Sequence, residues 1–275
     1  MEQTTNNNID NVLHTLSIQV SLNGLSFCTI DDHKHINAIE QDNFGIQLTP
    51  EQVLNKIKHT FDRNPALKGS FKTIEVIHQN NLYTIVPKAL FDKNLLTDYL
   101  KYNIKLLEND FIAYDELDQH EIVTVYIPLT NINNFFFETF GSFTYKHTST
   151  ILISSLLSQE KNSDNVTVFA NMNEKSFDLI IINRGKLILA NSFNHESKED
   201  FLYYLMFTTE QLQLNPEDFT LTFLGDIQKD SEYYTIAHKY IRNVDFGHHN
   251  GQEYKLPSTI DPIEPHQHFV LLSHF

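Results

Sequence analysis

Residues 13–30, LHTLSIQVSLNGLSFCTI, and residues 166–182, VTVFANMNEKSFDLIII, repeat one pattern, and this repeat predicts the fold. Each stretch contains an apolar strand, a polar turn and a second apolar strand, and the Asn23-Gly24 pair strongly favours a hairpin. The two turns lie about 150 residues apart, and the pattern after each of them also matches, which indicates an internal repeat. Two similar α/β units in one chain commonly flank a cleft that binds a ligand.

The secondary structure expected after each turn follows the same order in both halves. In the first half we expect strands at 13–20, 25–30 and 35–40, a helix at 51–62 that Thr49 caps and Pro50 opens, and strands at 72–78 and 82–86. In the second half we expect strands at 166–171, 176–183 and 186–193, a helix at 198–211, a strand at 219–224 and a helix at 231–242. Between the halves the pattern predicts helices at 91–103, 131–140 and 148–158 and strands at 121–128 and 143–147. The last expected element is a strand at 268–274, after a loop from 246 to 265.

Composition excludes several classes of protein. The 275 residues carry a net charge of −15, and the chain shows no cluster of lysine and arginine, so nucleic-acid binding is not expected. The single cysteine, Cys28, rules out an internal disulfide framework. Residues 1–11 are polar and predict a disordered tail without the features of a signal peptide. No apolar run reaches the ~20 residues that a membrane helix needs, so we expect a cytoplasmic protein that does not insert into a membrane.

The repeated order resembles a known superfamily. A βββαβα unit that occurs twice is similar to the ribonuclease-H-like duplication of the actin-like ATPases, sugar kinases and heat-shock proteins. The order of elements over 121–158, and the stretch FDLIIINRGKL at 177–187, resemble the actin-like pilus-assembly protein PilM and its relatives in type II secretion. The resemblance implies a duplicated α/β fold with a cleft between two lobes, in an uncharacterised bacterial family with degenerate nucleotide motifs.

The same resemblance implies a division of the chain into domains. After the tail of residues 1–11, we expect a first actin-like lobe at 12–120 and an inserted subdomain with a linker helix at 121–159. The second actin-like lobe is expected at 160–275. The two lobes should be related by a pseudo-twofold axis.

The nucleotide-binding motifs of this superfamily are mostly replaced here. Active members carry in each phosphate-binding hairpin an Asp that helps to hold a Mg²⁺-bound nucleotide, and two residues later a Gly that lets backbone N–H groups approach phosphate. At the Asp and Gly positions this chain has Gln19 and Ser21 in the first hairpin, and Asn171 and Asn173 in the second. The Gly-Gly pair on the adenosine side becomes Gly225-Asp226. Only Asp178 stands where relatives often have Asp. The vestigial nucleotide site implied by the resemblance consists of Gln19, Ser21, Asn23, Gly24, Asn171, Asn173, Asp178 and Gly225.

Loss of these anionic groups argues against ATP hydrolysis, because carboxylates anchor the metal that accompanies the phosphates. We therefore expect no catalytic residues and no cofactor, with ATP and Mg²⁺ as the alternative. The turn at Asn23-Gly24 has two interpretations: its backbone N–H groups bind an anion, or it is only a good hairpin turn. No nucleophile motif, Walker loop or dinucleotide fingerprint occurs.

Two further groups of residues suggest weaker sites. His266 and His268 would share one face of the expected final strand, which makes them candidate metal ligands without a third partner. Phe135, Phe136 and Phe137 are consecutive on an expected helix, and such residues diverge by ~100°, so one ring should face outward. An exposed aromatic ring often marks a partner surface, and we expect a groove near it.

Three functions remain open from the sequence. The first is a non-catalytic actin-like scaffold or adaptor, because PilM-type relatives imply binding to a short segment of a protein partner. The second is a nucleotide-binding ATPase or kinase with atypical phosphate loops. The third is a metal-dependent hydrolase built on the C-terminal histidines. The identity of the partner and the oligomeric state stay open.

Overall fold

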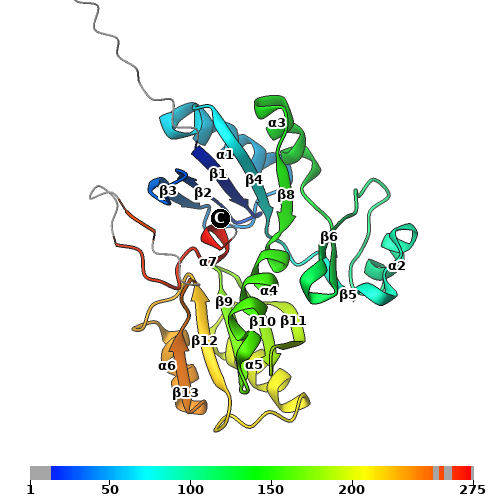
Figure 1. Cartoon of the computed structure of the whole chain (residues 1–275), viewed down its shortest axis with the longest axis vertical. Helices are drawn as coiled ribbons and strands as arrows, with labels where there is room; N and C mark the ends of the chain where they lie inside the picture. Colours follow the sequence, from blue (N-terminus) through cyan, green and yellow to red (C-terminus); the bar gives the residue numbers. More distant parts are fainter. Residues whose placement is uncertain (1–13, 250–253, 257–261, 274–275) are drawn as a thin grey trace, which may run out of the picture.

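The computed structural model describes residues 14–249, 254–256 and 262–273 and has two lobes, each built on a five-stranded sheet (Figure 1). The predicted tail at 1–11 lies outside the described residues. The first sheet has the order β3-β2-β1-β4-β8 and the second β11-β10-β9-β12-β13. Their strands are β1 (His14–Val20), β2 (Gly24–Ile30), β3 (Ile36–Asn43), β4 (Phe71–His78), β8 (Thr144–His147), β9 (Val166–Met172), β10 (Ser176–Asn183), β11 (Lys186–Asn194), β12 (Thr220–Gly225) and β13 (Asn243–Phe246). In both sheets the first three strands form an antiparallel meander and the last two pair in parallel.

The outer face of each sheet is covered by two helices at equivalent points of the chain. In the first lobe these are α1 (Pro50–Arg63) and α3 (Thr130–Phe140), and in the second α5 (Lys198–Gln211) and α6 (Glu232–Tyr240). A capping box at Thr49, with Pro50 at the first turn, begins α1 as predicted. One core, containing Val53, Ile57 and Phe136, joins α1 and α3 to the first sheet, and a separate core lies under α5 and α6.

A third core joins the lobes. It surrounds α4 (Thr148–Gln159) and the short α7 (Phe269–Leu272), which lie between the two sheets (Figure 1). Each of these helices follows the last strand of its own half, so both halves have the order βββαβαβα. The expected duplicated ribonuclease-H-like fold is therefore confirmed, and it extends one strand and one helix beyond the predicted βββαβα unit.

The insertion lies elsewhere than the sequence indicated. A separate three-stranded sheet of order β5-β7-β6 comprises β5 (Tyr83–Pro87), β6 (Ala113–Leu117) and β7 (Ile122–Tyr126), with its own small core and helix α2 (Leu96–Leu100). The predicted boundary at 120/121 falls inside this sheet, since β7 pairs with β5 and β6. In contrast β8, which the prediction placed in the insertion, pairs with β4 in the first lobe.

Several predicted elements differ in the structure. The helix expected at 91–103 is reduced to α2, which two 3₁₀ turns at 88–90 and 93–95 precede. The strand expected at 268–274 is the helix α7 where the structure describes it, and its four side chains are all buried. A fully buried apolar run has no periodicity that separates strand from helix, which explains the error. Strands β6 and β13 were not predicted, because each is short and contains two polar residues in its sequence, AYDEL and NVDF.

Within the described ranges, no helix has the length and apolar character needed to cross a membrane.

Candidate binding cleft between the lobes

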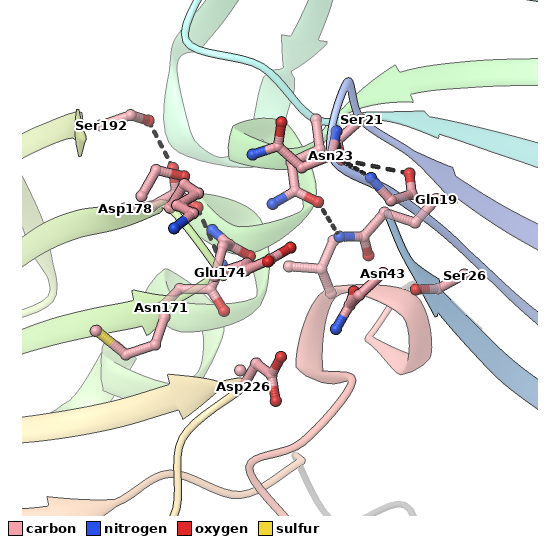
Figure 2. A pocket seen from close by; sticks show the side chains of 18 of the residues that line it. Gln19, Ser21, Asn23, Ser26, Asn43, Asn171, Glu174, Asp178, Ser192 and Asp226 are labelled. Atoms are coloured by element: carbon pink, nitrogen blue, oxygen red, sulfur yellow. Dashed lines mark hydrogen bonds between the residues drawn. The ribbon is translucent and has the colours of Figure 1, made fainter. Parts of the chain in front are cut away.

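A cleft of about 460 Å³ lies between the hairpins β1–β2 and β9–β10. All eight residues of the predicted vestigial site line it, and Figure 2 shows most of them converging from the two lobes. The strand registers place the two hairpins in equivalent positions. Val20 pairs with Leu25 and His78, and Met172 pairs with Phe177 and Gly225. The residues predicted from the repeat therefore lie at one cleft, and their chemistry decides what the cleft can bind.

The first hairpin binds its own backbone amides. The Ser21 hydroxyl oxygen accepts hydrogen bonds from the backbone N–H groups of Asn23, at 3.1 Å, and Gly24, at 2.9 Å. The backbone N–H of Ser21 in turn donates to the Gly24 carbonyl at 3.0 Å. These two turn amides are the groups that an anion would need, and an internal acceptor already satisfies them. Of the two interpretations of this turn, the geometry therefore favours the hairpin over the anion site.

The lost carboxylate of the first hairpin is replaced by a pair of amides. Gln19 donates from Nε2 to Oε1 of Gln79 at 2.6 Å. Gln79 follows β4, and its backbone N–H donates to the Val20 carbonyl at 2.9 Å. This pair ties the ends of β1 and β4 together without any negative charge, so it offers no strong ligand for Mg²⁺.

The second hairpin keeps one carboxylate, but it is buried and already bonded. Asp178 accepts a hydrogen bond from Ser192 Oγ at 2.5 Å on one oxygen and from Asn171 Nδ2 at 3.0 Å on the other. Burial raises the pKa of Asp178, and the hydrogen bonds from Ser192 and Asn171 offset part of that rise. No described cation pairs with it.

A tyrosine of the insertion completes this group. The hydroxyl of Tyr83 lies 3.2 Å from Ser192 Oγ, which gives its single proton to Asp178. Ser192 Oγ therefore lies between the two groups, within hydrogen-bond distance of both. Burial, followed by the nearby charge of Asp178, raises the pKa of Tyr83, so it keeps its proton. The hydrogen bonds that link Tyr83, Ser192 and Asp178 hold the insertion against the second lobe and occupy one oxygen of the carboxylate.

The C-terminal segment covers the adenosine side of the predicted site. The backbone N–H of Gly225 donates to the His266 carbonyl at 2.9 Å, and that of Asp226 donates to the Met172 carbonyl at 2.8 Å. His268 and Phe269 also line the cleft. Both backbone amides at the end of β12 are therefore hydrogen bonded within the protein. The C-terminal segment, through His266, lies next to the end of β12, where the resemblance places adenosine.

The two C-terminal histidines do not share a strand face, contrary to the prediction, because residues 265–268 form a turn before α7. His266 is 5% exposed and its Nε2 hydrogen bonds to the Ile227 carbonyl at 2.7 Å. His268 has a left-handed backbone at φ 50°, and burial lowers its pKa. Throughout the described part of the chain, no three histidine, cysteine or acidic side chains are grouped to hold a metal ion.

The charge of the cleft is unfavourable for a polyphosphate. Among the described residues that line it, four are acidic and Lys175 is the sole lysine or arginine. The rest of the polar lining is dominated by asparagine and glutamine. The acidic side chains are Glu174, Asp178, Glu196 and Asp226. The negative field of these side chains lowers the local concentration of anions. Together with the lack of free turn amides, it disfavours binding of a polyphosphate.

The three consecutive phenylalanines of α3 point in three directions, as the helical spacing predicts. Phe136 is fully buried in the core of the first lobe, Phe137 is 65% exposed, and Phe135 is half-buried on a groove between α1 and α3. Since Phe135 and Phe137 lie two positions apart on the helix, the exposed ring is on the flank away from the groove. The expected groove and the expected outward ring both exist, but on different sides of α3.

Sequence reasoning missed Gln79, Tyr83 and Ser192. Gln79 could have been found as the residue that follows the fourth strand. Tyr83 and Ser192 carry no local signal, because they approach Asp178 only through the placement of the insertion. Ser21 stands where the superfamily has glycine, and in the structure its hydroxyl is the acceptor that closes the turn.

These features define an actin-like α/β protein whose interlobe site departs from a nucleotide site. Solved structures agree on the fold. A Bacteroides thetaiotaomicron protein with an actin-like ATPase fold and unknown function matches with a TM-score of 0.76 at 22% identity, covering 86% of this chain and 91% of that one. The PilM–PilN type IV pilus biogenesis complex matches with a TM-score of 0.55 at 11% identity, covering 86% and 89%. A comparison with curated proteins gave no match.

The chain belongs to the family described as "Protein of unknown function (DUF3822)", whose model matches residues 3–244. The resemblance to actin-like proteins that the sequence indicated is therefore confirmed at the level of the fold.

Proposed function

We propose that this protein is a non-catalytic actin-like scaffold or adaptor that binds a protein partner. The observation that carries the proposal is the bonding of the Asn23 and Gly24 amides to Ser21 Oγ, which leaves the first phosphate hairpin closed. The amide pair Gln19–Gln79 and the C-terminal segment at Gly225 support it, because they remove the metal anchor and cover the adenosine side. Catalysis of phosphoryl transfer depends on a metal ion and charged groups held in position around the phosphates.

Binding of a protein partner is supported by two observations. The PilM–PilN structure is described as a complex, and we extend partner binding from it to this chain. Phe137 exposes 65% of its surface on a chain of net charge −15. A large exposed ring on a charged surface costs solubility and is typical of an interaction site.

The proposal predicts that Phe137→Asp weakens capture of the partner. Tagged wild-type protein, Phe137→Asp and a matched control, Tyr240→Asp, would be used to isolate partners from the native cell. Tyr240 is also an exposed ring, at 56%, but it lies on α6 of the second lobe. We expect the wild type and the control to recover the same partner and Phe137→Asp to lose most of it, with or without Mg-ATP. Equal recovery by all three proteins, or recovery only with Mg-ATP, would contradict the proposal.

A further inference from the structure

The face between α1 and α3 carries a groove with an aromatic wall and basic edges. Its volume is about 590 Å³, and we call it the α1–α3 groove. Phe61, Phe135 and Phe140 form its apolar wall, and Lys58 and Lys68 lie on its edges. Phe61 packs against the other two rings, and the distance between ring centroids is 5.7 Å in both pairs. Such mutual packing makes the wall rigid, so it is present before any partner arrives.

This part of the surface differs in charge from the rest of the molecule. The chain as a whole carries −15, yet residues 56–72 hold five of its 20 lysines and arginines and one acid, Asp62. The cations are Lys56, Lys58, Arg63, Lys68 and Lys72. Of these five, Lys58 and Lys68 line the α1–α3 groove. Lys56 lies over the Phe44 ring and Lys72 pairs with Asp32, so the groove has a local basic edge of two lysines.

Most of these cations are not neutralised within the protein. Lys72 pairs with Asp32 at 2.9 Å, but no described carboxylate pairs with Lys56, Lys58 or Arg63. Lys58 instead lies over the Phe135 ring, with its nitrogen 5.7 Å from the centroid. An ammonium group held beside an aromatic wall can pair with a carboxylate while the neighbouring ring contacts an apolar side chain.

We propose that the α1–α3 groove binds an acidic segment of the protein partner, which inserts an aromatic or large aliphatic side chain against Phe61 and Phe135. This rests on the proposed function in taking the partner to be a protein. The apolar wall supplies an anchor pocket of the kind that dominates interface energy. Lys58 and Lys68 on the edge pair with no described carboxylate, although Lys68 donates to the Asp62 carbonyl, and their charges select a negative segment and accelerate association.

Two other anionic partners fit the groove less well. A nucleic acid would gain from the lysines but would be repelled by the −15 charge of the whole chain. An anionic membrane presents a flat charged surface, whereas the apolar atoms here line a concave groove with Asp62 at its edge. A segment that combines a few carboxylates with one apolar side chain matches both parts of the site.

The direct test uses synthetic fluorescent peptides and the full-length protein. The probe is a short peptide rich in glutamate with a central phenylalanine. Two matched probes replace its glutamates by lysines or its phenylalanine by alanine. Fluorescence anisotropy should show that only the first peptide binds, and that its affinity falls with rising salt as exposed charges are screened. Equal binding of the acidic and basic peptides, or no binding of the acidic one, would overturn the proposal.

Protein variants locate the binding. Lys58→Glu and Lys239→Glu make the same charge change at exposed lysines on α1 and α6. Thr139→Glu and Thr235→Glu are matched more closely, because each threonine is exposed and donates to the carbonyl four residues earlier in its helix. We expect Lys58→Glu and Thr139→Glu each to lower the affinity for the acidic peptide about tenfold, which corresponds to about 1.4 kcal/mol of binding free energy. The α6 variants should bind like wild type. Equal loss in both pairs would show a general charge effect and refute the groove.

The same variants separate this inference from the function proposed above. If the wild-type protein recovers a cellular partner that Lys58→Glu recovers equally well, the groove is not the docking site, although the scaffold function stands. If no partner is recovered by any protein, the scaffold function fails. The peptide measurement then still decides whether the groove selects acidic segments.

Discussion

Replacing Phe136 by alanine should lower the free energy of unfolding by about 3–5 kcal/mol, the usual cost of removing a large ring from a packed core. Phe136 is fully buried and packs against Phe61, Phe140 and Phe143 at centroid distances of 5.8, 6.1 and 6.2 Å. For a chain of this size the loss corresponds to a fall in Tm on the order of 10 °C. Denaturant unfolding followed by circular dichroism would measure it.

The matched control for that substitution is the next residue of the same helix. Phe137→Ala removes an equal side chain from a position that is 65% exposed, so its effect should stay within ~0.5 kcal/mol. Similar losses at both positions would mean that α3 is not packed as described, and the assignment of Phe137 to a partner surface would fail with it.

Replacing Gly225 by alanine should destabilise the protein by about 2–3 kcal/mol, through strain at positive φ and through a clash. Gly225 has φ +78°, and a Cβ added there would lie 2.3 Å from the Met172 carbonyl oxygen and 2.8 Å from Asn171 Oδ1. The close approach of β12 to β9 therefore depends on this glycine.

A second glycine isolates the two causes. Gly45 has a similar φ of +71°, but an added Cβ would meet no atom within 4 Å. Gly45→Ala should therefore show only the strain of the positive φ, about 1 kcal/mol. Thermal unfolding of both variants would give the comparison, and equal losses would exclude the clash and the tight junction at the base of the cleft.

Much of this arrangement was predictable from the repeat. Matching the Asn23 turn with the Asn173 turn was enough to place both hairpins at one cleft, because equivalent strands of a duplicated fold meet across its axis. The role of Ser21 was accessible in principle, since a serine that precedes a tight turn often bonds to the amides that follow. It was missed because the family pattern presented that position only as a lost glycine.

Other features could not be read from local patterns. The bond from Tyr83 to Ser192 joins residues more than 100 positions apart, and no spacing rule indicates it. The insertion was misplaced because β8, with residues of intermediate polarity, gives no sign of which sheet it joins. The basic edge of the α1–α3 groove was missed because its lysines are dispersed along a helix and a turn, so only the folded chain brings them together.

We propose that the groups lining the cleft are hydrogen bonded within the protein and therefore do not bind a nucleotide. Isothermal calorimetry with Mg-ATP and Mg-ADP tests this most directly, together with an assay for released phosphate. The closed Ser21 turn, the bonded Asp178 and the bonded Gly225 amide predict no saturable heat up to about millimolar nucleotide, and no turnover. Micromolar binding that Asn171→Ala abolishes, or release of phosphate above the level without protein, would contradict the account and favour an ATPase with atypical loops.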